Sequence, residues 1–259
     1  MTVITVFNQK GGVGKTTTSL NLAAAMAARG QRPLLIDLDP QSHLTHTLGI
    51  SIDRSEESIY AFFQRTRTLA ELVRPAPAGM RLIPAHLDLA KADAVFGKSY
   101  NIVTRLAGAL RTETLEDAQE PVVIDCSPML GVLSLNALFA CELVLVPISA
   151  DFLALNGALK VEKTLKALEH VLKRRLPRRY LLTRFDRRRR MAREILEAAR
   201  RHFGQEVCTT TICEDVRVAE SPALSKNVFE HAPNCRGARD YQAFLEELLA
   251  SDFARQKAA

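Results

Sequence analysis

Glycines and lysines gather near the amino end of the chain, in the run Lys10-Gly11-Gly12-Val13-Gly14-Lys15-Thr16-Thr17. An apolar stretch precedes this run and an Ala- and Leu-rich stretch follows it, which predicts a strand before the loop and a helix after it. Glycines let the backbone curl until several N–H groups converge on phosphate oxygens, and the helix amino end adds a positive dipole. We expect Lys15 to supply charge to a triphosphate and Thr16 to ligate magnesium. Every residue from Lys10 to Thr17 is expected to contact the nucleotide.

The second lysine distinguishes this loop from the common phosphate-binding pattern. That pattern begins with a glycine where this chain has Gln9, and Lys10 follows. The run resembles the signature of the ParA/MinD family of P-loop ATPases, whose cofactors are ATP and Mg²⁺. The resemblance implies that Lys10 reaches across a nucleotide-sandwich dimer to the phosphates bound by the other subunit. The alternative is a lysine that lines its own loop, since a charge near phosphates is also useful within one chain.

Aspartates close two further apolar stretches. Leu35-Ile36-Asp37-Leu38-Asp39-Pro40-Gln41 is similar to the family's switch segment, and Val122-Val123-Ile124-Asp125-Cys126-Ser127-Pro128 to its Walker B element. Side chains two positions apart on a strand point the same way, and a carboxylate buried near a cation stays ionised. The resemblance implies that Asp39 orients the attacking water. The expected catalytic residues are Lys10, Lys15 and Asp39. The expected magnesium ligands are Thr16, Asp37 and Asp125.

Three later segments extend the resemblance over nearly the whole chain. Residues 146–157 are similar to a segment of the dimer face, with Asp151 where relatives commonly carry Glu. Residues 181–188 and 216–222 resemble the segments that flank the adenine in Soj-type members. These matches place the chain nearer to the ParA/Soj group than to MinD.

Basic residues crowd into one part of the sequence. Residues 160–201 hold 16 Lys or Arg and 5 Asp or Glu, a local charge of +11 in a chain of net charge +6. The basic runs are Lys173-Arg174-Arg175, Arg178-Arg179 and Arg187-Arg188-Arg189-Arg190, with few acids between them. Nonspecific DNA binding needs only phosphate neutralisation. The resemblance implies this binding, with Arg187, Arg188, Arg189 and Arg190 as the candidates.

Two considerations oppose the DNA assignment. Charge runs are often solvated faces with no ligand. Glu214 also stands where relatives carry a basic residue, so the arginine run would have to compensate for it.

The order of apolar runs predicts an α/β fold with a doubly wound, mostly parallel sheet and helices on both faces, as in P-loop NTPases. Strands are expected at residues 3–7, 34–37, 81–84, 122–125, 143–147, 180–183 and 207–212. Several are apolar throughout, which a sheet covered on both faces requires. We expect one domain over residues 1–259, with an amphipathic helix at about 237–255 packed on it.

Composition favours a cytoplasmic protein. The 5 cysteines are scattered without a C-x-x-C pair, so neither a disulfide framework nor a zinc site is indicated. No apolar run is long enough to span a membrane. The expected carboxy-terminal helix carries acids on its polar face, namely Asp240, Glu246, Glu247 and Asp252, which argues against a membrane-surface helix.

The resemblance implies a slow ATPase that forms a homodimer on ATP, binds nucleoid DNA nonspecifically and is stimulated by a ParB-like or cargo-adaptor protein. Its cargo would be a chromosome, a plasmid or another large body. One alternative is a MinD-like membrane-associated ATPase, and another is an orphan relative that positions a protein cluster. An iron–sulfur reductase would need a glycine-rich cysteine pair, a context that Cys126 and Cys141 lack. A DNA-binding module with a vestigial nucleotide site is the remaining alternative.

Overall fold

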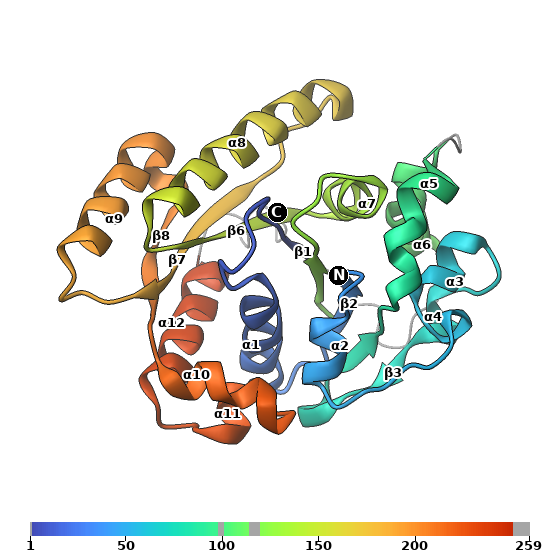
Figure 1. Cartoon of the computed structure of the whole chain (residues 1–259), viewed down its shortest axis with the longest axis horizontal. Helices are drawn as coiled ribbons and strands as arrows, with labels where there is room; N and C mark the ends of the chain where they lie inside the picture. The colour runs from blue at the N-terminus through green and yellow to red at the C-terminus, as the bar shows by residue number, and fades with distance from the viewer. Residues whose placement is uncertain (1, 98–100, 114–119, 251–259) are drawn as a thin grey trace.

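A central sheet runs through the computed structural model, which describes residues 2–97, 101–113 and 120–250. Its strand order is β3-β4-β2-β5-β1-β6-β7-β8, and within the described residues only β3 and β4 pair antiparallel (Figure 1). The strands are β1 (Val3–Val6), β2 (Leu34–Leu38), β3 (Arg74–Pro75), β4 (Arg81–Ile83), β5 (Val122–Cys126), β6 (Leu143–Ser149), β7 (Arg178–Phe185) and β8 (Val207–Cys213).

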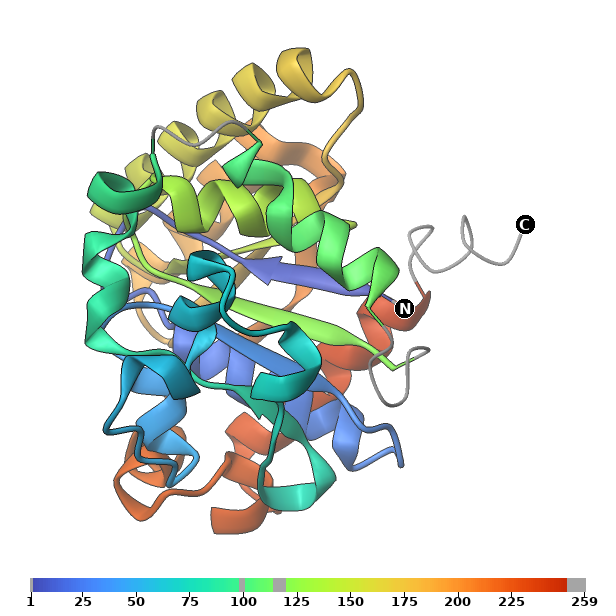
Figure 2. The ribbon, with the colours of Figure 1, turned by 90° about the vertical axis from the view of Figure 1, so that its right-hand side faces the viewer.

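Helices cover both faces of the sheet (Figure 2). They are α1 (Lys15–Ala27), α2 (His43–Thr47), α3 (Ile59–Gln64), α4 (Leu69–Leu72), α5 (Ala92–Phe96), α6 (Arg105–Thr112), α7 (Val132–Ala140), α8 (Phe152–Leu172), α9 (Arg190–Phe203), α10 (Val216–Glu220), α11 (Val228–His231) and α12 (Arg236–Ala250). The helices α1, α2, α11 and α12 pack on one face, and α3 and α5 to α9 on the other.

Alternation along the strands divides the interior into two apolar cores. Val122 and Ile124 belong to the core under α7 and α8, whereas Val123 between them belongs to the core under α1 and α12. A central parallel strand is buried on both faces, so it must be apolar at every position. The predicted fold class is therefore confirmed.

Each expected strand is present, with shifted ends. The strands β6 and β7 run two residues past their predicted carboxyl ends, to Ser149 and Phe185. The edge strand β3 was not predicted, because two residues that include a proline carry no periodic signal.

The described part of the predicted carboxy-terminal helix is α12, and residues 251–255 lie outside the described residues. Its apolar face, with Tyr241 and Phe244, is buried against α1 and β8. Its acids do not simply face solvent: Glu247 accepts hydrogen bonds from Thr209 N and Thr210 N at 2.8 and 2.7 Å. The carboxylate thus fixes α12 to the exposed edge of β8.

All five cysteines are buried with free thiols. Burial raises the pKa of the Cys126 thiol well above its ordinary value, so the side chain packs as a small apolar group. Along the described ranges, no helix is long and apolar enough to cross a bilayer.

Candidate nucleotide-binding site

The loop between β1 and α1 lies at the carboxyl edge of the sheet. Gly12 and Gly14 have φ of +75° and +85°, a left-handed backbone that other residues rarely adopt. Gly14 is the last residue before α1, so its conformation turns the chain directly into the helix. This geometry leaves backbone N–H groups at the start of α1 available for an anion.

Thr183, near the end of β7, supports the loop from below. Its hydroxyl donates to the Val13 carbonyl at 2.9 Å, and a Cβ at Gly14 would lie 3.8 Å from the same hydroxyl. Thr183 belongs to residues 181–188, which were expected to flank the adenine, but its contact with the phosphate loop was not predicted because it joins segments 170 positions apart.

Lys15 lies inside the loop and is 8% exposed. Its ammonium donates to the Lys10 carbonyl at 3.0 Å. Burial lowers the pKa of Lys15, while the charges of Asp125 and Asp39 oppose that shift. The Lys15 ammonium, held by the loop backbone and close to two carboxylates, is positioned to bind a phosphate.

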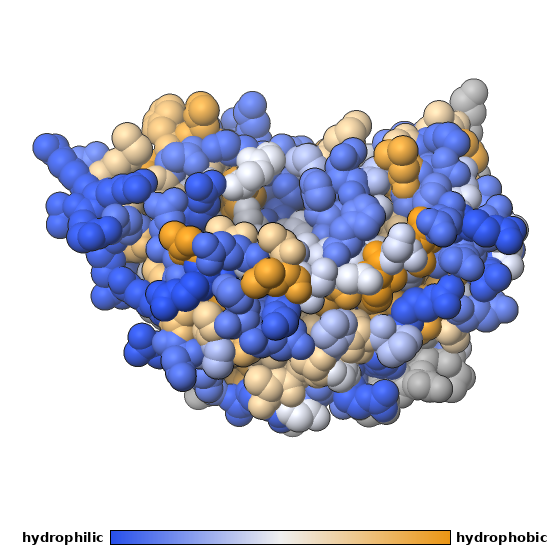
Figure 3. Space-filling view, turned by 60° about the horizontal axis from the view of Figure 1, so that its bottom comes forward, coloured by the Kyte–Doolittle hydropathy of each residue, from blue (hydrophilic) through white to orange (hydrophobic). Residues whose placement is uncertain are grey.

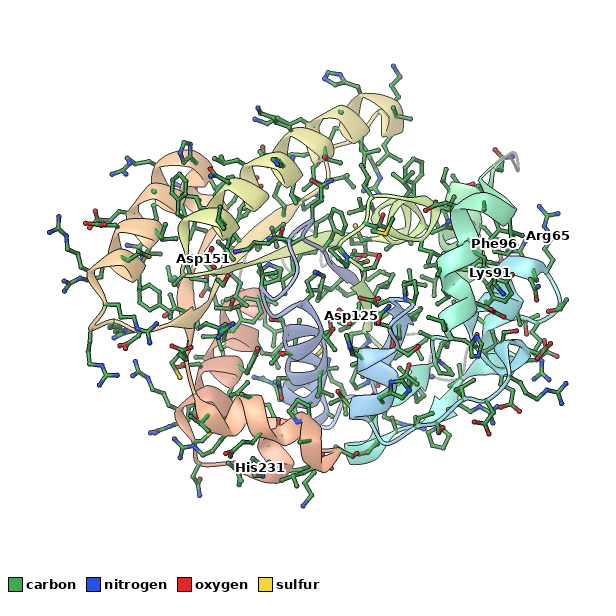
Figure 4. The ribbon with its side chains drawn as sticks, in the orientation of Figure 1. Arg65, Lys91, Phe96, Asp125, Asp151 and His231 are labelled. Atoms are coloured by element: carbon green, nitrogen blue, oxygen red, sulfur yellow. The ribbon has the colours of Figure 1, made fainter. Side chains whose placement is uncertain are left out.

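Asp125 lies fully buried at the end of β5 (Figure 4). It accepts hydrogen bonds from Thr16 Oγ1 at 2.7 Å and from Ser19 Oγ at 2.9 Å. Burial is the main cause that raises its pKa, and the neighbouring Asp37 adds to the shift. Sequence reasoning missed Ser19, although its place one turn after Thr16 on α1 would have put both hydroxyls on one side of the helix.

Asp37 pairs in register with Asp125 on the adjacent strand and is also fully buried. Its carboxylate accepts from Thr45 Oγ1, Thr45 N and Asp39 N, at 2.7, 2.9 and 3.0 Å. Burial raises its pKa, although these hydrogen bonds oppose the shift. The structure thus places Asp37 beside Asp125 but turns it toward its own loop, and its role as a metal ligand stays a prediction.

Asp39 lies on the same loop and is buried, with 8% of its surface exposed. It accepts from Gln41 N at 2.9 Å, and its charge acts on Lys15. The carboxylate therefore lies on the phosphate side of the site.

Lys10 takes a different direction from Lys15. Its ammonium lies 2.6 Å from Asp151 Oδ1, and the two side chains are 29% and 42% exposed. Asp151 caps the amino end of α8 by accepting from Ala154 N, and it accepts from Ser149 Oγ. Figure 4 shows Asp151 and Asp125 on opposite sides of the loop that precedes α1. The two lysines of the loop are thus directed to different partners.

The four arginines Arg187, Arg188, Arg189 and Arg190, here called the arginine turn, join β7 to α9 and are all exposed. Hydrophilic side chains cover the side of the molecule where α9 lies (Figure 3, left). Asp186 pairs with Arg188 at 3.0 Å, and Glu214 pairs with Arg189 at 3.2 Å.

Few acids lie between the basic runs in the sequence, but some of these arginines pair with acids in the folded chain. Arg178 is 3% exposed and pairs with Glu162 at 3.1 Å and with Glu169. Arg179 pairs with Glu247 at 3.0 Å. Arg178 and Arg179 thus form buried or half-buried ion pairs with acids on α8 and α12, so these two arginines add little to the exposed basic surface.

A cavity of about 610 Å³ lies at the other edge of the sheet, against Val3, Cys141 and Glu142 at the amino ends of β1 and β6. It is remote from the phosphate loop. Within the described residues, no group of His, Cys, Asp and Glu side chains could hold a metal ion unaided.

Known proteins resemble this chain over nearly its whole length. A protein family described as an AAA domain matches residues 1–177. The chromosome-partitioning ATPase Soj of Thermus thermophilus is 40% identical over 251 residues, 95% of each chain. The chain belongs to the ParA/Soj family of chromosome-partitioning ATPases. The chromosome partitioning protein ParA of Caulobacter vibrioides is 34% identical over 99% of this chain and 97% of its own.

Solved structures support the fold of this ParA/Soj-family ATPase. Cobyrinic acid a,c-diamide synthase from Mycobacterium smegmatis, with bound ADP and magnesium, superposes with a TM-score of 0.82 at 32% identity. The superposition covers 96% of this chain and 94% of the other.

Proposed function

We propose that this chain binds MgATP at residues 10–17, pairs with a second copy around the nucleotide, and binds DNA nonspecifically in the paired form. Slow hydrolysis, stimulated by a ParB-like or cargo-adaptor protein, then separates the pair. The observation that carries the proposal is the different direction of the two loop lysines. Lys15 is buried against its own backbone, whereas Lys10 extends away from it to a half-exposed carboxylate, a position from which it would reach another subunit's phosphates on pairing.

The donors at the floor of the site fit magnesium and a triphosphate. Thr16 and Asp125 offer hard oxygens, which magnesium prefers, and phosphate oxygens and water would complete its shell. Bound there, the ion would neutralise charge on the β- and γ-phosphates. Lys15 would hold the phosphates, Asp125 would hold Thr16 toward the ion, and Asp39 would orient the attacking water.

Exposed apolar side chains on the same edge support pairing. Met129 and Leu130 follow β5, Phe152 and Leu153 begin α8, and their exposed fractions are 69%, 45%, 62% and 68%. Apolar side chains this exposed gain free energy when a partner covers them. Pairing through this edge would bury them and bring each Lys10 to the other subunit.

DNA binding is assigned to the arginine turn. Four exposed guanidinium groups on one short segment suit a row of phosphates, and none needs to read a base. A membrane-surface role for α12 receives no support, because its apolar face is already buried against α1 and β8. We further propose that the protein is cytoplasmic and associated with the nucleoid.

Charge reversal of the arginine turn tests the DNA assignment. Changing Arg187, Arg188, Arg189 and Arg190 to Glu should abolish ATP-dependent binding to duplex DNA and leave ATP-dependent pairing intact, as measured by fluorescence anisotropy and light scattering. A matched control reverses the exposed Arg54, Arg65, Arg67 and Lys91. Figure 4 shows Arg65 and Lys91 on the side of the molecule opposite α9. Equal loss in both variants, or unchanged binding in the first, would reject the assignment.

A further inference from the structure

The hydroxyl of Thr45 joins three segments that meet beside the catalytic loop. It donates to Asp37 Oδ2 at 2.7 Å and accepts from Ala85 N at 3.0 Å. Thr45 and Ala85 are each 1% exposed, and Asp37 is fully buried. One hydroxyl on α2 therefore connects the end of β2 with the backbone that follows β4.

These bonds close the segment from Asp37 to Thr45 into a loop. Asp37 Oδ1 accepts from Asp39 N at 3.0 Å, while Oδ2 accepts from Thr45 N at 2.9 Å. The Asp37 carboxylate is thus held at both ends of the segment that carries Asp39. A contact that holds the Asp37 carboxylate in place therefore also holds the backbone of Asp39.

Packing alone does not hold this segment. A cavity of about 260 Å³ borders it, lined among others by Gln41, Thr45 and Ala85. Gln41 itself is exposed. Leu38 and Leu44 hold the two ends of the segment in the apolar cores, whereas the stretch between them borders the cavity and depends on directional hydrogen bonds for its position.

We infer that Thr45 is a positioning residue for ATP hydrolysis, which acts by holding Asp37 and through it the loop that presents Asp39 to the attacking water. The inference rests on the proposed role of Asp39. Thr45 does not contact the nucleotide in this account. Its loss should slow the chemical step and leave nucleotide affinity nearly unchanged.

Paired substitutions separate positioning from folding. Thr45→Val keeps the shape and removes the hydroxyl, Thr45→Ser keeps the hydroxyl, and Thr47→Val is a control on the same helix, where the Thr47 hydroxyl makes no hydrogen bond to the described residues. Steady-state kcat and KM, the Kd for a fluorescent ATP analogue and the melting temperature are measured for each. Asp39→Asn is measured alongside.

Thr45→Val should lose about 10- to 100-fold in kcat, the scale of a misplaced catalytic group, with the analogue Kd within about twofold of the wild type. Thr45→Ser should recover most of the kcat, and Thr47→Val should match the wild type. An unchanged kcat in Thr45→Val, or a parallel loss of kcat, affinity and melting temperature without rescue by Ser, would overturn the inference. If Thr45→Val does not fold, Thr45→Ala is judged by the same criteria.

Asp39→Asn separates the proposed role of Asp39 from the inferred role of Thr45. Full turnover in that variant would refute the proposed role of Asp39, whatever Thr45 does. An inactive Asp39→Asn together with a fully active Thr45→Val would refute only the role of Thr45.

Discussion

The floor of the site concentrates buried charge. Asp37 and Asp125 are both fully buried on adjacent strands; burial raises the pKa of each, and the charge of Asp37 adds to the shift at Asp125. Hydroxyl donors from Thr16 and Ser19 stabilise the ionised form of Asp125 but do not cancel the cost of burial. A cation that enters this site meets carboxyl groups whose ionisation it would favour.

This arrangement predicts a pH dependence of folding in the nucleotide-free protein. Burial raises the pKa of Asp125 from 3.8 to about 7, so the folded state retains a proton that the unfolded chain releases. That stabilisation is complete below pH 4 and is lost as the pH rises through about 7. We expect the free energy of unfolding in urea to fall between pH 5 and pH 8, by at most ~4 kcal/mol from this group.

The matched variant for this prediction is Asp125→Asn, which should reduce the slope, most clearly between pH 6 and pH 8, because Asp37, whose pKa burial raises to about 6, still adds slope at lower pH. Carboxyl groups whose pKa is lowered, such as Asp151, are ionised in both states over this range and add no slope. A wild-type profile that rises toward pH 8, or an equal slope in Asp125→Asn, would contradict the assignment.

Glu214 lies among the arginines proposed to bind DNA. Its carboxylate pairs with Arg184 at 3.5 Å and with Arg189 at 3.2 Å, so it competes with phosphate for the same guanidinium groups. Glu214→Gln should tighten duplex binding about 2- to 5-fold at low salt. It should also steepen the dependence of the binding constant on salt, because roughly one to two more ions would be released on binding.

The control for Glu214 is Glu56→Gln, which removes the same charge next to Arg54, far from the arginine turn. Filter binding or anisotropy over a range of salt concentrations gives both slopes. If Glu214→Gln and Glu56→Gln gain the same DNA affinity, the effect comes from net charge and not from the position of Glu214.

At the scale of elements, the phosphate loop depends on its neighbours in the sheet. The loop follows β1 and leads into α1, and Thr183 of β7 stabilises it through a hydrogen bond to Val13. The loop's own glycines permit its conformation, but the hydrogen bond from β7 selects one position for it.

Removal of that support should weaken nucleotide binding. Thr183→Val deletes the hydroxyl and leaves the Val13 carbonyl without this donor, a loss on the scale of ~1 kcal/mol. We expect the Kd for a fluorescent ATP analogue to rise about fivefold. Thr183→Ser should bind as the wild type does, and a Thr183→Val protein with wild-type affinity would show that β7 does not hold the loop.

Local patterns were sufficient to predict the fold and to indicate where the candidate site lies. The glycine loop, the apolar strands and the position of Asp125 all depend on residues close together in sequence. The contact of Thr183 with Val13 could not be found in that way, because 170 positions separate the two residues. Ser19 could have been found, because its place one turn after Thr16 puts both hydroxyls on one side of α1, although its partner Asp125 lies 106 positions away. Arg178 was counted among the basic runs for a different reason: its partners Glu162 and Glu169 lie only 16 and 9 positions away, but the pairing depends on how α8 packs beside β7.

At the scale of the whole molecule, the groups needed for the proposed ATP-dependent pairing lie along the carboxyl edge of the sheet. The phosphate loop, Asp39, Asp125, the Lys10–Asp151 pair and the exposed apolar side chains before α7 and on α8 lie on this edge. The arginine turn follows β7 on the same edge. One surface could therefore couple nucleotide, partner copy and DNA.

The central claim is that Lys10 acts on phosphates bound by the other subunit. The decisive measurement is the mass in solution with magnesium and a non-hydrolysable ATP analogue, by light scattering. The wild type should move from 28.7 kDa for one chain toward twice that mass, and Lys10→Ala should remain at one chain. Asp151→Asn, which removes the partner of Lys10 but can still cap α8, should pair as the wild type does. A Lys10→Ala protein that pairs as readily as the wild type would contradict the account.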